Sequence, residues 1–505
     1  MIRSLFACFA GAFLICSVPM AALADADTAT TTKDAKEDEK NTPHFAPFPS
    51  DRSVAQSAVI GGRHIAYRAT VGSIEVRDDK GKAIGEVVYT AYTLPKAGPQ
   101  RPVTFAFNGG PGASSVYLNL GAIGPKRVRF GDKGDSPSDP PILEDNPSSW
   151  LDMTDLVFID PVGTGFSRSL ESADKTKKDF YANEPDIKYL SRVVYDWLVR
   201  NGRLRSLKYV IGESYGGYRA PRIAHELVSA LGVGVSGIVM VSPYLDPAAV
   251  GDGTALSPLP WMINLPSMTA GHLEREGRLS AAAMQDVMAY TRGQFATDLL
   301  AGSSDPEAQA RLVAKVSGYT GLDPALVRKL GGRVDVDTYL REVHRDDQQL
   351  GSVYDSNIVA YDPFPWSAQN QANDPMLDMI IAPTTSAMVD FITRVVGWNV
   401  DARYNALSYA VNEAWDRGKP QDRPVSDLRK AIAIDPKMGV LIAHGWDDLS
   451  CPFFGSRLIV DQLPRFGVAE RVHLGVYPGG HMFYTRTGSA EAFKHDAAAL
   501  YARRG

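Results

Sequence analysis

The sequence predicts an α/β fold in which a mixed, mostly parallel central sheet is interrupted by a largely helical insertion. Three observations indicate this fold. Short apolar runs of strand length alternate with segments of helical spacing over the first half of the chain. Such runs are rare between about residues 250 and 400. The alternation returns at Val440, so the two parts of the sheet flank the insertion.

The first strands of the sheet are predicted to be antiparallel. Several short alternating runs lie within Ser53–Leu94, among them Ile65–Thr70 and Ser73–Val76, with turn residues between them. Asp79–Lys82 has the composition of a hairpin turn, and the strand Glu86–Tyr92 follows it. Because strands joined by a short turn pair side by side in opposite directions, we expect an antiparallel start to the sheet.

The core of the sheet is predicted from compact apolar runs and the helices between them. Pro185–Arg200 has apolar residues at helical spacing, and Tyr218–Leu231 can form a helix directly after a strand. Ser489–Arg504 closes the chain as a third predicted helix. The predicted core strands are Val103–Phe107, Leu156–Ile159, Leu207–Ile211, Ile238–Val241, Val440–Ala443 and Val472–Val476.

The N-terminus has the features of a secretory signal peptide. Arg3 supplies a positive charge, Leu5–Val18 is mostly apolar, and Ala22–Ala24 offers small residues before a cut after Ala24. The mature protein is therefore expected in the periplasm or outside the cell. The apolar run is short for a membrane span.

The rest of the chain divides into four segments. Residues 25–45 are polar and are expected to form a disordered leader. The α/β core is predicted in two parts, 46–245 and 406–505, and the helical insertion is predicted at 246–405.

Charge and cysteine content argue against several classes of protein. A net charge of −5 gives no electrostatic basis for binding nucleic acid or an anionic membrane, and no later segment predicts a membrane span. No spacing of histidines and cysteines indicates a metal site, and no cofactor is expected. Gly232–Gly237 fits a dinucleotide fingerprint but precedes a strand instead of following one. Cys8 and Cys16 lie in the signal segment, so Cys451 remains alone and no internal disulfide forms.

Gly212–Gly217 is typical of a nucleophile elbow, since it lies between a predicted strand and a predicted helix. Ser214 would be the nucleophile. A side chain at Gly212 or Gly216 would crowd the sharp turn that exposes the serine hydroxyl. A Gly-rich turn with an exposed serine is the alternative, which the string alone leaves open.

The partners of the serine follow in the chain order expected of an α/β-hydrolase fold, acid before base. His481 follows the last predicted strand on a flexible Gly-containing loop and fits the general base. Asp448 follows the strand before it, three residues after Gly445, and is the preferred acid, with Asp447 as the alternative.

The oxyanion hole needs two backbone N–H groups directed at the developing negative charge. One is expected from Tyr215, just after the nucleophile. The other is expected from Gly110, in the Gly-rich loop that follows the strand Val103–Phe107. The frequency of Gly and Pro in turns alone would make that loop an ordinary turn. Its place after a core strand favours the functional interpretation.

These motifs resemble those of the serine carboxypeptidase family (peptidase family S10). The similarity extends from about residue 85 to the C-terminus, apart from the insertion. The Asp and His regions, Gly445–Pro452 and Gly480–Met482, are similar more loosely. The blocks that carry the resemblance are Asn108–Ser115, Asn146–Trp150, Asp160–Ser167 and Gly212–Gly217.

The resemblance implies hydrolysis of the last peptide bond of substrates with a free C-terminus. It also implies that Asn108, with Gly109, and Glu213 bind the substrate carboxylate. A protonated Glu213 can donate a hydrogen bond to a carboxylate, whereas an ionised one repels it. We therefore expect Glu213 to be protonated in the active complex and the activity to favour acidic pH. Cys451, three residues after Asp448, is expected either to line the pocket or to be a small buried residue.

The chain departs from the family pattern at several positions. Ala106 stands where the family usually has Trp, and Ala122 stands where it often has a second Glu, so two carboxylate-binding groups are missing. Ala113 replaces a common Cys, in keeping with the absence of disulfides. Phe483–Tyr484 stands where the family commonly has Val-Pro. The departures leave open a related esterase or acyltransferase on the same scaffold, and a non-catalytic binding protein is the third alternative.

Overall fold

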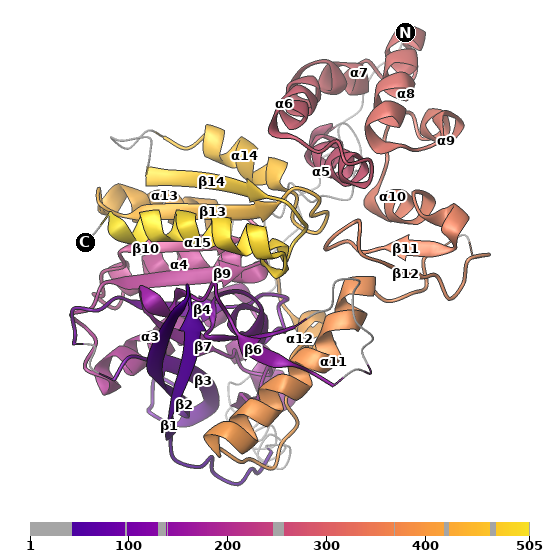
Figure 1. Ribbon diagram of the computed structural model, residues 1–505. Helices are drawn as coiled ribbons and strands as arrows, with labels where there is room; N and C mark the ends of the chain where they lie inside the picture. Colours follow the sequence, from indigo (N-terminus) through magenta and orange to yellow (C-terminus); the bar gives the residue numbers. More distant parts are fainter. Residues whose placement is uncertain are drawn as a thin grey trace, which may run out of the picture.

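The computed structural model describes residues 43–95, 98–129, 138, 140–245, 257–367, 369–418, 424–464 and 471–503. The predicted signal peptide and residues 25–42 of the predicted leader lie outside the described residues. A ten-stranded sheet crosses the described part of the chain in the order β1-β2-β3-β7-β4-β9-β10-β13-β14, with β8 beside β3 (Figure 1).

The sheet is antiparallel at one end and parallel through the rest. β1, β2, β3 and β7 pair antiparallel in turn, and each later neighbour in the order runs parallel to the one before it. This arrangement confirms the predicted fold class. The strands are β1 (Arg52–Ile60), β2 (Arg63–Arg77), β3 (Ala83–Thr93), β4 (Val103–Phe107), β7 (Asp155–Ile159), β8 (Arg168–Ser169), β9 (Lys208–Glu213), β10 (Gly237–Val241), β13 (Gly439–Gly445) and β14 (Val472–Tyr477).

The prediction of separate strands at Ile65–Thr70 and Ser73–Val76 is wrong, because both lie in the continuous strand β2. Up to Val71 the buried odd-numbered residues of β2 pack into the core on one side of the sheet. From Ile74 the even-numbered residues pack into the core on the other side. The alternation therefore breaks at Gly72 without a turn, and the pairing with β3 continues through it.

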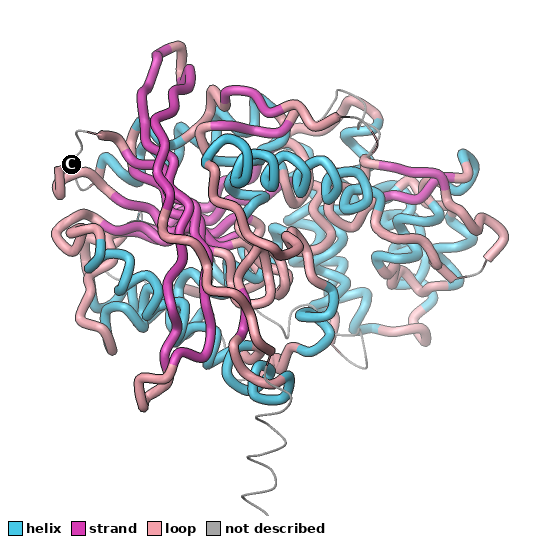
Figure 2. The backbone as a smooth tube through the Cα atoms, turned by 90° about the horizontal axis from the view of Figure 1, so that it is seen from below, coloured by secondary structure: helices cyan, strands magenta, loops and turns pink. Residues whose placement is uncertain are grey.

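Helices cover both faces of the sheet (Figure 2). α3 (Asn183–Arg200), α4 (Tyr215–Ser229) and α13 (Pro424–Ile434) pack on one face, where Val210 of β9 belongs to the same buried cluster. α15 (Thr487–Ala502) packs on the other face. Successive side chains of a strand point to opposite faces, and here helices cover both faces. The central strands are therefore buried on both sides and lack a polar face.

The chain between β10 and β13 is mainly helical, and α5 to α10 form a lobe beside the sheet (Figure 1). In the described part of the segment between β10 and β13, six helices begin at a Ser or Asp whose side chain accepts a backbone N–H. These contacts satisfy donors that the start of a helix leaves free. The boundaries predicted for the five chain segments stay predictions. The elements are α5 (Leu259–Arg275), α6 (Ala281–Tyr290), η4 (Thr291–Phe295), α7 (Ala296–Ala301), α8 (Pro306–Thr320), α9 (Pro324–Lys329), α10 (Val336–Glu342), η5 (Arg345–Asp347), β11 (Gln349–Gly351), β12 (Val359–Tyr361), α11 (Pro375–Asp390), η6 (Phe391–Val396) and α12 (Tyr409–Ala414).

One helix among the described residues, Pro375–Val396, is long and apolar enough to cross a membrane by length and composition, with a mean hydropathy of 1.3. It spans α11 and η6. Met376, Ile380 and Phe391 on it belong to the same buried cluster as residues of the central sheet. Packing in that core accounts for the apolar residues on the buried side of this helix.

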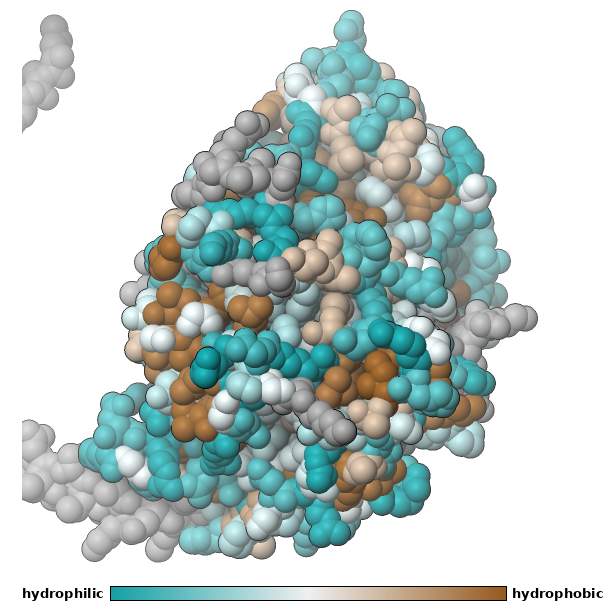
Figure 3. Space-filling view, turned by 60° about the vertical axis from the view of Figure 1, so that its left-hand side comes forward, coloured by the Kyte–Doolittle hydropathy of each residue, from teal (hydrophilic) through white to brown (hydrophobic). Residues whose placement is uncertain are grey.

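The remaining elements connect the strands or lie at the ends of the sheet. On the face shown in Figure 3, hydrophobic side chains lie in small groups separated by hydrophilic ones, as is usual for a folded domain surface. These elements are η1 (Leu118–Ile123), β5 (Lys126–Val128), β6 (Leu143–Asp145), η2 (Trp150–Asp152), α2 (Ala173–Phe180), α14 (Phe453–Asp461) and η8 (Phe483–Thr485).

Candidate active site

Ser214 stands at a strained turn between β9 and α4. Its backbone has φ 60° and ψ −121°, a conformation that a residue with a side chain rarely adopts. A Cβ atom on Gly212 would lie 1.8 Å from the carbonyl oxygen of Gly216, and one on Gly216 would lie 2.2 Å from that of Phe107. Both positions therefore require glycine.

Hydrogen bonds on both sides of Ser214 hold the turn. Its N–H donates to the carbonyl of Val241 at 2.9 Å, and its carbonyl accepts from Tyr244 and Gly217 at 3.0 and 2.8 Å. The half-buried side chain lies at the wall of a cavity that the sequence-predicted base also lines. Rigid support of this kind lets a turn keep an unfavourable conformation.

The structure brings Asp448, and not Asp447, to His481. Asp448 Oδ2 lies 2.9 Å from His481 Nδ1, and Asp448 Oδ1 accepts the backbone N–H groups of Ser450 and Cys451 at 2.9 Å. Burial alone would lower the pKa of His481, but the adjacent Asp448 carboxylate outweighs it and raises that pKa above its ordinary value.

The loops after β13 and β14 approach each other closely to make this contact. A Cβ atom on Gly445 would lie 1.9 Å from the carbonyl oxygen of Gly480, so a side chain there would push the loops apart. The backbone of His481 is held at both ends: its N–H donates to the carbonyl of Tyr354, and its carbonyl accepts from Ser242 Oγ at 2.8 Å. His481 therefore has a fixed position.

Gly110 and Tyr215, the predicted oxyanion residues, line the same cavity. No acceptor for either backbone N–H occurs within the described parts of the chain. Gly109 brings the two segments together, since a Cβ atom on it would lie 2.4 Å from the Tyr215 nitrogen. Two unpaired N–H groups beside a nucleophile are what an oxyanion hole needs.

Asn108 and Glu213 form a buried pair at the cavity. Asn108 Nδ2 donates to Glu213 Oε2 at 2.6 Å, and the N–H of Leu118 donates to Asn108 Oδ1 at 2.9 Å, which fixes the orientation of the amide. Glu213 is 2% exposed. Burial raises the pKa of Glu213 to about 7, although the nearby His481 and the hydrogen bonds from Tyr484 and Asn108 favour its ionised form.

The cavity has a volume of about 300 Å³ and a partly apolar wall. Cys451 lines it and is also buried, so the structure combines the two alternatives for this residue; burial raises the pKa of its thiol. Leu377 and Ile380 of the insertion, and Leu407 just after it, contribute apolar side chains to the wall. The wall can therefore accommodate an apolar part of a substrate.

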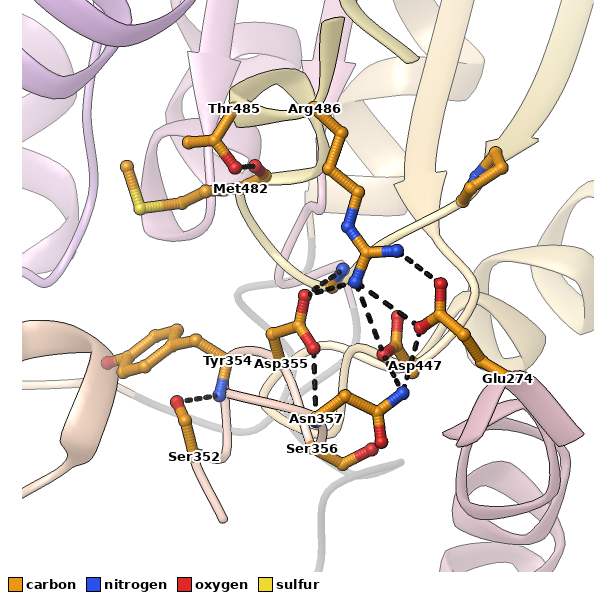
Figure 4. Close-up of polar contacts among 12 residues, drawn as sticks. Glu274, Ser352, Tyr354, Asp355, Ser356, Asn357, Asp447, Met482, Thr485 and Arg486 are labelled. Atoms are coloured by element: carbon orange, nitrogen blue, oxygen red, sulfur yellow. Dashed lines mark hydrogen bonds and ion pairs between the residues drawn. The ribbon is translucent and has the colours of Figure 1, made fainter. Parts of the chain in front are cut away.

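A second polar cluster lies next to the loop that carries His481, which we call the base loop (Figure 4). Arg486 pairs with Glu274 of α5 and, through Nη2 at 2.9 Å, with Asp355 of the insertion. Asn357 Nδ2 donates to Glu274 at 2.8 Å and to Asp447 at 3.3 Å. Burial, with the carboxylates of Asp355 and Glu274, raises the pKa of Asp447 well above its ordinary value. Asp447 therefore belongs to the contact between core and insertion, and no local pattern of residues indicated this cluster.

A buried ion pair joins α4, the helix that follows Ser214, to α3. Arg219 Nε donates to Asp186 Oδ2 at 2.7 Å, and both side chains are fully buried. Arg219 Nη1 donates to the carbonyl of Asn108 at 2.7 Å. The pair thus fixes the start of the oxyanion loop. Sequence reasoning missed it because the two residues come from different helices.

Sequence reasoning also missed the role of Tyr484, whose hydroxyl donates to Glu213 Oε1 at 2.7 Å. The only available signal was its departure from the family pattern. The other late histidines, His473 and His495, lie on the surface near Asp496, as their places in a strand and a terminal helix suggested.

Comparison with protein families identifies part of the chain. Residues 67–279 match the family model described as serine carboxypeptidase. The matched segment contains the oxyanion loop, Glu213 and Ser214. Asp448 and His481 lie beyond it, so their pairing rests on the geometry.

Curated relatives include a serine carboxypeptidase-like protein and a carboxypeptidase. A serine carboxypeptidase-like protein of Arabidopsis thaliana is 28% identical over 218 residues, which are 41% of this chain and 42% of the relative. A pheromone-processing carboxypeptidase of Ogataea parapolymorpha is 33% identical over 181 residues, 35% of this chain and 26% of the relative. The matches thus span less than half of these relatives.

A solved structure shares the fold over most of the chain. The crystal structure of a prohormone-processing carboxypeptidase from Saccharomyces cerevisiae superposes with a TM-score of 0.55 and 16% identity, over 86% of this chain and 91% of the other. At this identity the likeness concerns the fold alone.

Proposed function

We propose that this chain, which belongs to the serine carboxypeptidase family, is a serine hydrolase that releases the C-terminal residue of peptides through an acyl-enzyme. One observation carries the proposal. Ser214, His481 and the Asn108–Glu213 pair line one cavity. A nucleophile with its base thus lies beside a group able to bind a carboxylate.

Each group has a role in the reaction. Ser214 Oγ attacks the carbonyl carbon of the last peptide bond, and His481 takes the hydroxyl proton. The N–H groups of Gly110 and Tyr215 stabilise the negative oxygen. His481 then gives the proton to the leaving amine, and the C–N bond breaks to leave the acyl group on Ser214. A water molecule, deprotonated by His481, attacks this ester and releases the shortened peptide. Asp448 orients His481 and stabilises its charged form.

Glu213 is proposed to recognise the free C-terminus in its protonated form. With a pKa raised to about 7, the side chain holds its proton at acidic pH and donates a hydrogen bond to the substrate carboxylate, alongside Asn108. Ionisation of Glu213 places a buried negative charge beside that carboxylate and weakens binding. Recognition of a free C-terminus therefore favours acidic pH.

An esterase or acyltransferase is the second candidate. Ala106 and Ala122 are buried at 0% and 4% exposure and offer no polar group for a carboxylate. In that case the acyl group of a simple ester reaches Ser214 without the carboxylate contact and passes to water or to another acceptor. A non-catalytic binding protein is a weaker alternative, since Ser214 and His481 line one cavity and Asp448 bonds to His481.

Export is proposed from the sequence alone. The charged start, the apolar run and the small residues before Ala24 support cleavage there and a periplasmic or extracellular protein. Detection of a mature N-terminus at Asp25 in a cell fraction outside the cytoplasm tests this proposal.

The decisive experiment is product analysis of a peptide pool by mass spectrometry at acidic and neutral pH. Loss of single C-terminal residues by the wild type, and none by Ser214→Ala, is expected. Peptides blocked at the N-terminus are compared with their C-terminal amides and with simple esters. Faster cleavage of esters with no release of free C-terminal residues would favour the second candidate. Absence of fluorophosphonate labelling at Ser214 would favour the binding protein.

A further inference from the structure

Glu213 has a hydrogen-bond donor on each of its carboxyl oxygens. Asn108 Nδ2 donates to Oε2 at 2.6 Å, and the hydroxyl of Tyr484 donates to Oε1 at 2.7 Å. Asn108 and Glu213 line the cavity, whereas Tyr484 is not among its lining residues. Oε2 therefore lies with Asn108 on the side that a substrate reaches, and Oε1 lies on the side held by Tyr484.

The surrounding core fixes the ring of Tyr484. It lies in η8, three residues after His481, and is 2% exposed. A Cβ atom on Gly121 would lie 3.1 Å from Cε2 of the ring, so the ring covers the backbone next to Ala122. Phe483 stacks on Tyr477 with ring centroids 4.9 Å apart and anchors the turn. Tyr484 thus supplies a polar group from the base loop where Ala122 supplies none.

The hydroxyl of Tyr484 keeps its proton, and so remains a hydrogen-bond donor, over the whole pH range of the proposed activity. Burial raises the pKa of Tyr484 well above its ordinary value, and the Glu213 charge adds to this effect. Among the described residues, the other titratable groups that act on Glu213 come from three segments. They are Tyr117 in the segment after β4, Asp448 and Cys451 in the loop after β13, and His481 in the loop after β14. A hydrogen bond from a neutral donor stabilises an ionised carboxylate more than a protonated one.

We propose that Tyr484 is a positioning residue that holds Glu213 Oε1, directs the carboxyl proton to Oε2 at the cavity, and sets the pH range of C-terminal recognition. The inference rests on the proposed carboxypeptidase function. Each carboxyl oxygen accepts one hydrogen bond, but Tyr484 holds Oε1 away from the cavity and Oε2 lies with Asn108 at the cavity, so a proton on Oε2 is the one that a substrate carboxylate can accept. Because the same contact favours the ionised form, Tyr484 also limits how far recognition extends to alkaline pH.

The test is Tyr484→Phe, which removes one oxygen and keeps the ring. For a peptide and its C-terminal amide, the ratio of kcat/KM values is measured from acidic to alkaline pH, since the ratio cancels steps common to both substrates. The pH at which this ratio falls is expected to rise by about one pH unit. The KM of the free peptide at acidic pH is expected to rise several-fold, about threefold to tenfold, while the amide is little affected.

Tyr477→Phe is the matched control. It removes a buried hydroxyl from the strand that leads into the same loop, where it donates to Asp496 at 2.6 Å. It is expected to leave the ratio unchanged at every pH. Gly121→Ala is an independent perturbation, since the new methyl group presses on the Tyr484 ring, and it should shift the ratio in the direction of Tyr484→Phe.

Three outcomes separate the hypotheses. A shifted ratio for Tyr484→Phe, with none for the control, supports the inference. A folded Tyr484→Phe protein that loses activity equally on both substrates, with an unshifted ratio, overturns it and leaves a structural role. A wild type that releases no C-terminal residue, yet cleaves esters, refutes the proposed function instead.

Discussion

Replacing Glu213 by Gln removes the proton on which C-terminal recognition is proposed to depend. The side chain keeps its shape and stays neutral at every pH. Its carbonyl can accept from Asn108, and its NH₂ can donate to the hydroxyl of Tyr484, which also accepts hydrogen bonds. The substitution thus retains the buried network while it abolishes the titration.

The magnitude follows from the pKa. A rise from 4.5 to about 7 means that the folded protein holds the Glu213 proton more tightly than the unfolded chain does. At about 1.36 kcal/mol per pH unit, the shift corresponds to about 3 kcal/mol. This stability is fully present below the unfolded pKa and is lost as the pH rises through 4.5 and past about 7. Glu213→Gln does not lose this stability at higher pH, because its side chain does not ionise.

Two measurements check the reasoning. Unfolding by urea, followed at about pH 4 and about pH 9, should show that the stability of Glu213→Gln relative to the wild type grows by about 3 kcal/mol between them. In the wild type, the ratio of kcat/KM for a free peptide over its amide should fall about tenfold per pH unit above pH 7. In Glu213→Gln the ratio should be flat.

A wild-type ratio that does not change with pH would refute the role of a protonated Glu213. A ratio that still falls in Glu213→Gln would show that another group titrates. Equal pH dependence of stability in both proteins would contradict the raised pKa. These results are independent, so each tests a separate step of the reasoning.

Three further substitutions test the surroundings of the site. Asp448→Asn should lower kcat about 10³–10⁴-fold with native circular dichroism, because His481 loses its orienting charge; a small loss in a steady-state assay contradicts this. Asp447→Asn should be more stable than the wild type near pH 8 and no more stable near pH 4, by urea unfolding, since the raised pKa of Asp447 makes its ionisation unfavourable. Asp186→Asn should destabilise by about 3–5 kcal/mol, because Arg219 is left buried and unpaired; a thermal midpoint equal to that of the wild type would rule this out.

The sequence could predict the nucleophile and its fold because their requirements are local. Gly212 and Gly216 are needed by a turn that a few consecutive residues define, and the strand before Ser214 is apolar on both faces. The pairing of Asp448 with His481 could be predicted from chain order, since both follow neighbouring parallel strands. The choice between Asp447 and Asp448 needed coordinates, because consecutive residues on a loop point in different directions.

Other features depend on contacts that a single sequence does not reveal. At Gly72 the buried residues of β2 change from one face of the sheet to the other, since the two buried clusters lie on opposite sides of it. In the sequence alone, this break in the pattern resembles a turn. Tyr484 joins Glu213 across 271 positions of the chain. Asp355 and Arg486 come from the insertion and the base loop. Neither contact has a local pattern that identifies it.

These long-range contacts converge on the loop that carries His481. Asp355 Oδ2 accepts the N–H of Gly480 at 3.1 Å, and the carbonyl of Tyr354 accepts the N–H of His481. Both acceptors belong to the insertion, whereas Tyr484 ties the other end of the loop to the elbow. A base must keep its position to within a fraction of an ångström to transfer a proton efficiently. In the proposed reaction the insertion therefore holds His481 as well as lining the cavity, and we expect substitutions in it to alter kcat without touching substrate.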